Sequence, residues 1–88
     1  MLFIFITTTQ LKFEIFIEKD KTIDELIKLY FKEINHPELY GDSSILFLYN
    51  GEIIKKGSKR LIKDYFKKNQ INTIIVHDAN ERIDHILL

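Results

Sequence analysis

The stretch Thr22–Pro37, TIDELIKLYFKEINHP, decides how the chain folds. Thr22 is followed three residues later by Glu25, which is the spacing of a capping box at the start of a helix. Asn35 is suited to end that helix, and Pro37 cannot continue its hydrogen-bonding ladder. Apolar side chains recur between these ends at helical spacing, at Ile23, Leu26, Ile27, Tyr30 and Ile34. We therefore predict one amphipathic helix on which the rest of the chain packs.

The residues before this helix predict two strands and a tight turn. Met1–Ile6 carries apolar side chains on both faces of an expected strand, and Leu11–Glu18 alternates in the manner of a second strand. Thr7–Gln10 separates them without a glycine, so Gln10 is the residue that we expect to adopt a positive φ. The N-terminal segment is therefore predicted to form a β-hairpin.

After the helix, turn residues separate shorter elements. His36–Ser44 contains a proline and a glycine and predicts a connection without an element of its own. Asn50-Gly51 predicts a type I′ turn between two strands. The elements expected here are strands at Ile45–Tyr49 and Glu52–Lys55, a helical turn within Leu61–Phe66, and a last strand at Ile71–His77 in which Ile74 and Val76 face inward.

Composition restricts the classes of function. The 88 residues are 45% hydrophobic, which suits one compact domain, and they include no cysteine for disulfides or thiolate metal sites. The 13 basic residues equal the 13 acidic ones, so no nucleic-acid partner is expected. The apolar run Leu2–Ile6 is too short to span a membrane and follows no basic segment. We expect an intracellular protein, cytoplasmic or nuclear, with no membrane partner.

One segment, Lys55–Lys68, is rich in lysine and arginine. Such a cluster is most simply a solvated basic edge, and the sharper alternative is a contact for an acidic partner. The residues that would make this contact are Lys55, Lys56, Lys59 and Arg60.

The sequence gives little support for catalysis. The histidines His36, His77 and His85 are not spaced as metal ligands, and no Ser/His/Asp or Cys/His set is visible. The glycines at 41, 51 and 57 fit turns better than a phosphate-binding loop. We therefore expect no enzyme activity, no metal and no cofactor.

The order of hairpin, helix, strand, Asn-Gly turn, short strand, helical turn and last strand resembles the β-grasp fold of the ubiquitin family, over Met1–His77. The resemblance is carried by Phe3 and Phe5, by Phe13, Ile15 and Ile17, by the helix start Thr22-Ile23, by Ile45–Gly51 (ILFLYNG), by Lys56-Gly57 and by Ile62–Tyr65 (IKDY). It implies an α+β domain over residues 1–78, with a mixed sheet of four to five strands packed on one main helix.

The chain also departs from the family. Conjugated members end in a Gly-Gly arm, but no glycine follows Gly57 here, so the chain as given is not a standard modifier. The connection after Pro37 is several residues longer than in ubiquitin, and we expect a surface loop to absorb it at little cost. Thr8 stands where ubiquitin has an exposed leucine, whereas Leu48 matches its exposed third-strand isoleucine.

The strand order of the family places outward residues of the first, third and last strands side by side. The resemblance implies a partner-binding surface made of Ile4, Ile6, Thr8, Leu46, Leu48, Ile75 and His77. Apolar patches of this kind on soluble domains are normally interaction sites. We therefore expect a non-conjugated ubiquitin-like domain or adaptor for protein–protein interaction.

The sequence is also compatible with three other roles for the chain. These are a structural subunit that associates permanently through the same face, a modifier whose Gly-Gly arm lies outside this sequence, and a GTPase-binding β-grasp module. A homo-oligomer is less favoured than a different protein partner. Residues 79–88 form a tail that is a docked short helix capped by Asp78 and Glu81, a disordered segment or a junction to further chain.

Overall fold

The computed structural model describes residues 1–87, in which helix α1 spans Ile23–Glu33. The Thr22 hydroxyl accepts a hydrogen bond from the Glu25 N–H at 3.1 Å, and the Glu25 carboxylate accepts one from the Thr22 N–H at 3.1 Å. At the other end Asn35 has a φ of 70°, and the His36 N–H donates to the Phe31 carbonyl at 2.9 Å. The predicted capping box is confirmed, and the helix ends in a Schellman motif.

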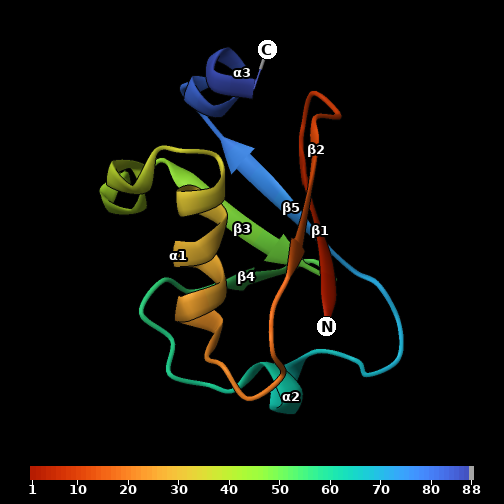
Figure 1. Ribbon diagram of the computed structural model, residues 1–88. Coiled ribbons are helices and arrows are strands. Elements are labelled where there is room, and N and C mark those ends of the chain that lie inside the picture. The colour runs from red at the N-terminus through yellow and green to blue at the C-terminus, as the bar shows by residue number, and fades with distance from the viewer. Residues whose placement is uncertain (88) are drawn as a thin grey trace.

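Five strands and three short helices accompany α1 (Figure 1). The short helices η1, α2 and α3 span Pro37–Gly41, Ile62–Tyr65 and Arg82–Leu87, and η1 is a 3₁₀-helix. The strands are β1 (Leu2–Thr7), β2 (Lys12–Phe16), β3 (Ile45–Tyr49), β4 (Glu52–Ile54) and β5 (Asn72–Asp78). Each predicted strand is present; β3 has the predicted bounds, and the ends of the others differ from the predicted ones by at most two residues.

The strands form one mixed sheet in the order β2-β1-β5-β3-β4. The central pair, β1 and β5, is parallel, whereas the hairpins β1–β2 and β3–β4 and the pair β3–β5 are antiparallel. Helix α1 lies across one face of this sheet (Figure 1). The chain therefore has the predicted α+β architecture, a β-grasp arrangement of one main helix on a five-stranded sheet.

The core between α1 and the sheet is unusually aromatic. Phe5 of β1 stacks on Tyr30 of α1, with ring centroids 4.4 Å apart. The ring of Phe47 of β3 is nearly perpendicular to those of Phe5, Tyr30 and Phe31, with ring centroids 5.9, 5.8 and 5.6 Å apart. Ile74 and Val76 of β5 are fully buried beside this cluster, so the predicted register of the last strand is confirmed.

Both hairpin turns have the positive φ angles that the sequence predicts. Gln10 in the first hairpin has a φ of 72°, which confirms the expectation for a turn without glycine. Asn50 and Gly51 have φ values of 51° and 81°, as a type I′ turn requires. This two-residue turn fixes the pairing of β3 with β4.

The connection after α1 differs from the prediction made from the sequence. We predicted no element in His36–Ser44 and a simple surface loop, but Pro37–Gly41 forms the 3₁₀-helix η1. Pro37 has the fixed φ that suits the first turn of a helix, and the apolar Leu39 is buried against the core. The longer connection therefore extends the hydrophobic core.

Asp24, in the first turn of α1, joins three parts of the chain. Its carboxylate accepts hydrogen bonds from the Tyr40 hydroxyl of η1 and from the Gly57 N–H, the latter at 2.6 Å. The Lys28 ammonium lies 3.1 Å from the same carboxylate. Burial raises the pKa of Asp24, but the hydrogen bonds from Tyr40 and Gly57 and the charge of Lys28 outweigh it, and the net pKa is lowered.

Replacement of Asp24 by alanine should lower the free energy of unfolding by about 1–3 kcal/mol at neutral pH, because partly buried donors lose their acceptor. A carboxyl with a lowered folded pKa stabilises the fold above its unfolded pKa, and this contribution is lost as pH falls through the folded value. Urea unfolding of wild type and Asp24→Ala should therefore converge below about pH 4.

The matched control for this prediction is Asp20→Ala, because Asp20 lies exposed in the loop before α1. Its loss of stability should stay within about 0.5 kcal/mol at every pH. A gap between wild type and Asp24→Ala that is independent of pH would contradict the carboxylate's role.

Helix α3 docks on the end of the core, close to the tip of the first hairpin (Figure 1). Its Ile83 side chain is fully buried. Asp78 accepts a hydrogen bond from the Ile83 N–H at 2.7 Å, whereas Glu81 sits in the turn before the helix with a φ of 53°. The Asp84 carboxylate accepts a hydrogen bond from the Thr9 hydroxyl at 2.7 Å. The segment 79–87 is thus packed onto residues 1–78.

Asp42 connects α3 to the loop before β3. Its carboxylate accepts hydrogen bonds from the Ser44 N–H at 2.9 Å and hydroxyl at 2.6 Å, and the Arg82 guanidinium lies 3.2 Å from its other oxygen. The bonds from Ser44, followed by the charges of Arg82 and Lys56, lower the pKa of Asp42. These contacts hold α3 at the sheet's end.

Candidate functional site

The face of the sheet opposite α1 keeps large aliphatic side chains in contact with solvent. Ile75 of β5 is 43% exposed, although its neighbours Ile74 and Val76 are fully buried on the other face. Leu46 of β3 is 39% exposed, and Ile53 of β4 is 56% exposed. Strand alternation therefore separates a closed core from an open apolar face.

The pairing register aligns four outward aliphatic side chains across the sheet, including Ile75 and Ile53. Ile6 pairs with Ile75, Ile75 with Leu48, and Leu48 with Ile53. Strands lie ~4.8 Å apart, so this aliphatic row, Ile6-Ile75-Leu48-Ile53, extends about 14 Å across four adjacent strands. At the β2 end of the row, Lys12 pairs with Ile6.

The predicted partner-binding residues are not all in one place. Six of them lie on the open face, since Leu46 pairs with His77 beside the row and Ile4 pairs with Thr73. Thr8 is exposed in the turn between β1 and β2, beyond the ends of both strands. The six residues that the structure brings together are Ile4, Ile6, Leu46, Leu48, Ile75 and His77.

The predicted surface left out three exposed hydrophobic residues, which are Ile53, Phe16 and, just before β5, the 54% exposed Ile71. Ile53 completes the aliphatic row, and the signal for it was present, because a two-residue turn at Asn50-Gly51 places residue 53 opposite Leu48. Phe16 is 75% exposed and pairs with Leu2 near the free edge of β2. Its alternation with the buried Ile15 also indicated an outward position.

The four basic residues predicted to contact an acidic partner have different surroundings. The Arg60 guanidinium lies 4.7 Å from the centroid of the Tyr65 ring. The Lys56 ammonium turns away, donating to the Asp42 carbonyl at 2.7 Å, and burial lowers its pKa. Lys55 and Lys59 are both exposed. Lys55 lines a surface hollow between β4 and α2, and Lys59 does not.

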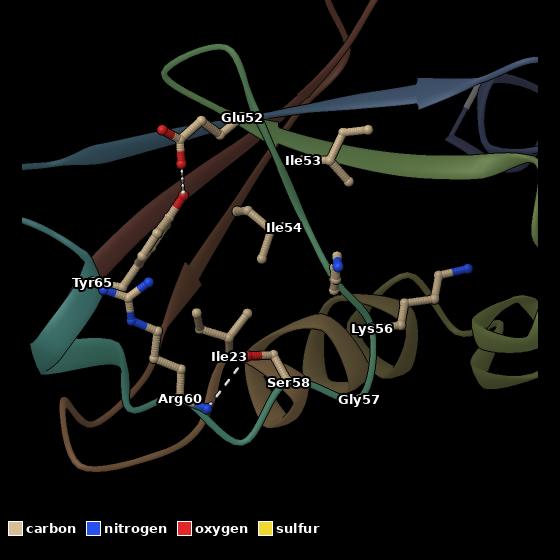
Figure 2. A pocket seen from close by; sticks show the side chains of 10 residues that line it. Ile23, Glu52, Ile53, Ile54, Lys56, Gly57, Ser58, Arg60 and Tyr65 are labelled. Atoms are coloured by element: carbon tan, nitrogen blue, oxygen red, sulfur yellow. Dashed lines mark hydrogen bonds between the residues drawn. The ribbon is translucent and has the colours of Figure 1, made fainter.

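A surface hollow of about 410 Å³ lies between β4 and α2 (Figure 2). Its floor includes the buried Ile23 and Ile54, and Tyr65 forms part of its wall. The Tyr65 hydroxyl donates to the Glu52 carboxylate at 3.2 Å. Burial, followed by this hydrogen bond, raises the pKa of Tyr65. The hollow is thus an apolar depression with a polar, mostly basic rim.

Within residues 1–87, no three His, Asp or Glu side chains converge in a way that would hold a metal ion. No helix in that range has both the length and the apolar character needed to cross a bilayer. The open face of the sheet offers apolar surface, and its burial by a partner would be favourable.

No protein-family model matches this sequence, and no curated protein matches it either.

Proposed function

We propose that this chain is a non-conjugated ubiquitin-like interaction domain that binds a protein partner through the open face of its sheet. The β-grasp strand order supports the likeness to the ubiquitin family. The observation that carries the proposal is the aliphatic row, because four adjacent strands each contribute one outward Leu or Ile. An accessible row of this length is characteristic of a surface that a partner covers.

The partner's chemistry follows from the residues in and around the row. Complete burial of a half-exposed Leu or Ile contributes roughly 1 kcal/mol, so the partner needs an apolar centre that covers several of these side chains together. Lys12 at one end of the row and Lys55 just after Ile53 favour carboxylates at the partner's rim. We therefore expect a protein surface or helix with apolar residues at its centre and acidic residues at its edges.

Leu48→Asp should abolish this binding while the domain stays folded. Leu48 lies inside the row between Ile75 and Ile53, so an aspartate there removes apolar contact and places an unpaired charge in the interface. We expect at least about thirtyfold weaker binding, as for other central interface residues. The partner would be recovered by proximity labelling, purified, and titrated calorimetrically against wild type and variant.

Gln70→Asp is the matched control, because it adds the same charge in the exposed loop before β5. It should bind as wild type does. An unchanged affinity of Leu48→Asp would sink the proposal. Sedimentation at low micromolar concentration tests the competing role of a permanent assembly subunit: the proposed domain is then a monomer, and a persistent homo-oligomer would favour assembly instead.

A further inference from the structure

We propose that the hollow between β4 and α2 is a second binding site, separate from the aliphatic row, and that its ligand is an extended peptide carrying acidic side chains next to aliphatic ones. The two sites meet at the β4 edge, where Ile53 belongs to the row and lines the hollow and where Lys55 lies beside both. The hollow combines a positioned cation, an apolar floor and a free strand edge.

Arg60 is the positioned cation. Its guanidinium stacks on the Tyr65 ring at 4.7 Å, and the hydrogen bond from the Tyr65 hydroxyl to Glu52 holds that ring in place. Figure 2 shows Arg60 lying along Tyr65 at the side of the hollow. No carboxylate within residues 1–87 forms an ion pair with Arg60. The planar guanidinium therefore keeps donors for a ligand carboxylate, which it can bind through two parallel hydrogen bonds.

The floor accepts an aliphatic side chain. Ile23 and Ile54 are 3% and 5% exposed, so a ligand side chain placed above them meets a surface already fixed by the core. Figure 2 shows both side chains facing the space between Tyr65 and the loop at Gly57. The volume of about 410 Å³ leaves room for an aliphatic side chain and its backbone. Pre-formed apolar surface of this kind costs little ordering on binding.

The outer edge of β4 supplies backbone groups. The sheet ends at β4, so this strand has a partner only in β3. Tyr49 and Glu52 flank the two-residue turn and form its hydrogen-bonded pair, which directs the N–H and C=O of Ile53 away from β3. A peptide in extended conformation can pair with these two groups, as in other cases of strand addition.

The charges around the hollow favour an acidic ligand. Lys55, Lys56 and Arg60 line it, whereas Glu52 is the one lining carboxylate, and the Tyr65 hydroxyl already donates to it. The Lys56 ammonium points away from the hollow in Figure 2, toward the Asp42 carbonyl. Arg60 and Lys55 are therefore the cations that we expect to contact the ligand.

The test uses the blocked hexapeptide Thr-Val-Glu-Val-Asp-Thr and its neutral counterpart Thr-Val-Gln-Val-Asn-Thr. Each is titrated into the ¹⁵N-labelled chain, and amide chemical shifts are followed by NMR. The acidic peptide should shift the amides of Ile53, Ile54 and Ser58 and leave those of Ile6 and Ile75 in place. The neutral peptide should bind at least about tenfold more weakly, because it lacks charge-assisted hydrogen bonds.

Two neighbouring cations provide matched variants. Arg60→Gln should weaken binding of the acidic peptide about tenfold or more, whereas Lys59→Gln, which removes a charge outside the hollow, should change it less than threefold. Lys55→Gln provides a second variant within the hollow and should weaken binding about threefold. Leu48→Asp should bind the peptide as wild type does, which separates this site from the aliphatic row.

Three results would overturn the proposal. The first is equal weakening by Lys59→Gln and Arg60→Gln, which would mean nonspecific attraction to a basic edge. The second is equal affinity for the neutral peptide. The third is an absence of shifts at Ile53 and Ser58 with the acidic peptide in large excess, or shifts at Ile6 and Ile75 in their place.

Discussion

We expect Phe47→Ala to lower the free energy of unfolding by about 3–5 kcal/mol. The Phe47 ring is 1% exposed and contacts the edges or faces of Phe5, Tyr30 and Phe31. Its removal leaves a cavity among rigid rings that cannot collapse to fill it. Domains of this size have only about 5–15 kcal/mol of total stability, so a large part is lost. Urea denaturation followed by circular dichroism measures the change.

Phe16→Ala is the matched control, since it makes the same chemical change in another strand of the same sheet. Phe16 is 75% exposed, so we expect its loss of stability to stay within about 0.5 kcal/mol. If the two variants lost stability equally, the assignment of inward and outward faces would be wrong.

The second large effect is expected for Ile83→Ala, which should lower the free energy of unfolding by about 2 kcal/mol. This is the low end of the range for isoleucine-to-alanine changes in a core. Ile83 is fully buried, but α3 is only six residues long and can detach from an otherwise folded domain. The loss cannot exceed the free energy with which α3 docks. Hydrogen exchange of the α3 amides should accelerate together with the exchange of Thr9, which contacts Asp84.

Ile86→Ala is the comparison for α3, because Ile86 lies three residues along the same helix and is only partly buried. Ile86→Ala should lower the free energy of unfolding by less than about 1 kcal/mol. If Ile83→Ala lost no more stability than Ile86→Ala, the placement of Ile83 in the core would be wrong.

The features predictable from the sequence are those specified by neighbouring residues. The capping box needs only Thr22 and Glu25, and the positive φ of Gln10 follows from a turn that has no glycine. The outward direction of Ile75 follows from alternation with its two neighbours. In each case, local chemistry and the requirements of the fold agree, so the prediction needs no knowledge of distant contacts.

The features that the sequence could not reveal depend either on residues far apart in the chain or on local patterns too short to show a period. The Asp24 carboxylate is held by Tyr40 of η1 and by Gly57 of the loop after β4. Arg60 and Tyr65 stack although their separation of five residues matches neither helix nor strand periodicity. The 3₁₀-helix η1 was missed because its one buried residue, Leu39, is too short a pattern to show a period.

The parallel pairing of β1 with β5 has a consequence for biosynthesis. The centre of the sheet joins Phe3–Thr7 to Asn72–Val76, so the core cannot close while the ribosome is still adding the intervening residues. Until then the uncharged, strand-forming segment LFIFI can pair with β2 on one side, but its other side lacks β5. Segments of this composition are prone to intermolecular pairing, so the β5 side of β1 is an aggregation-prone edge until residues 72–76 have been made.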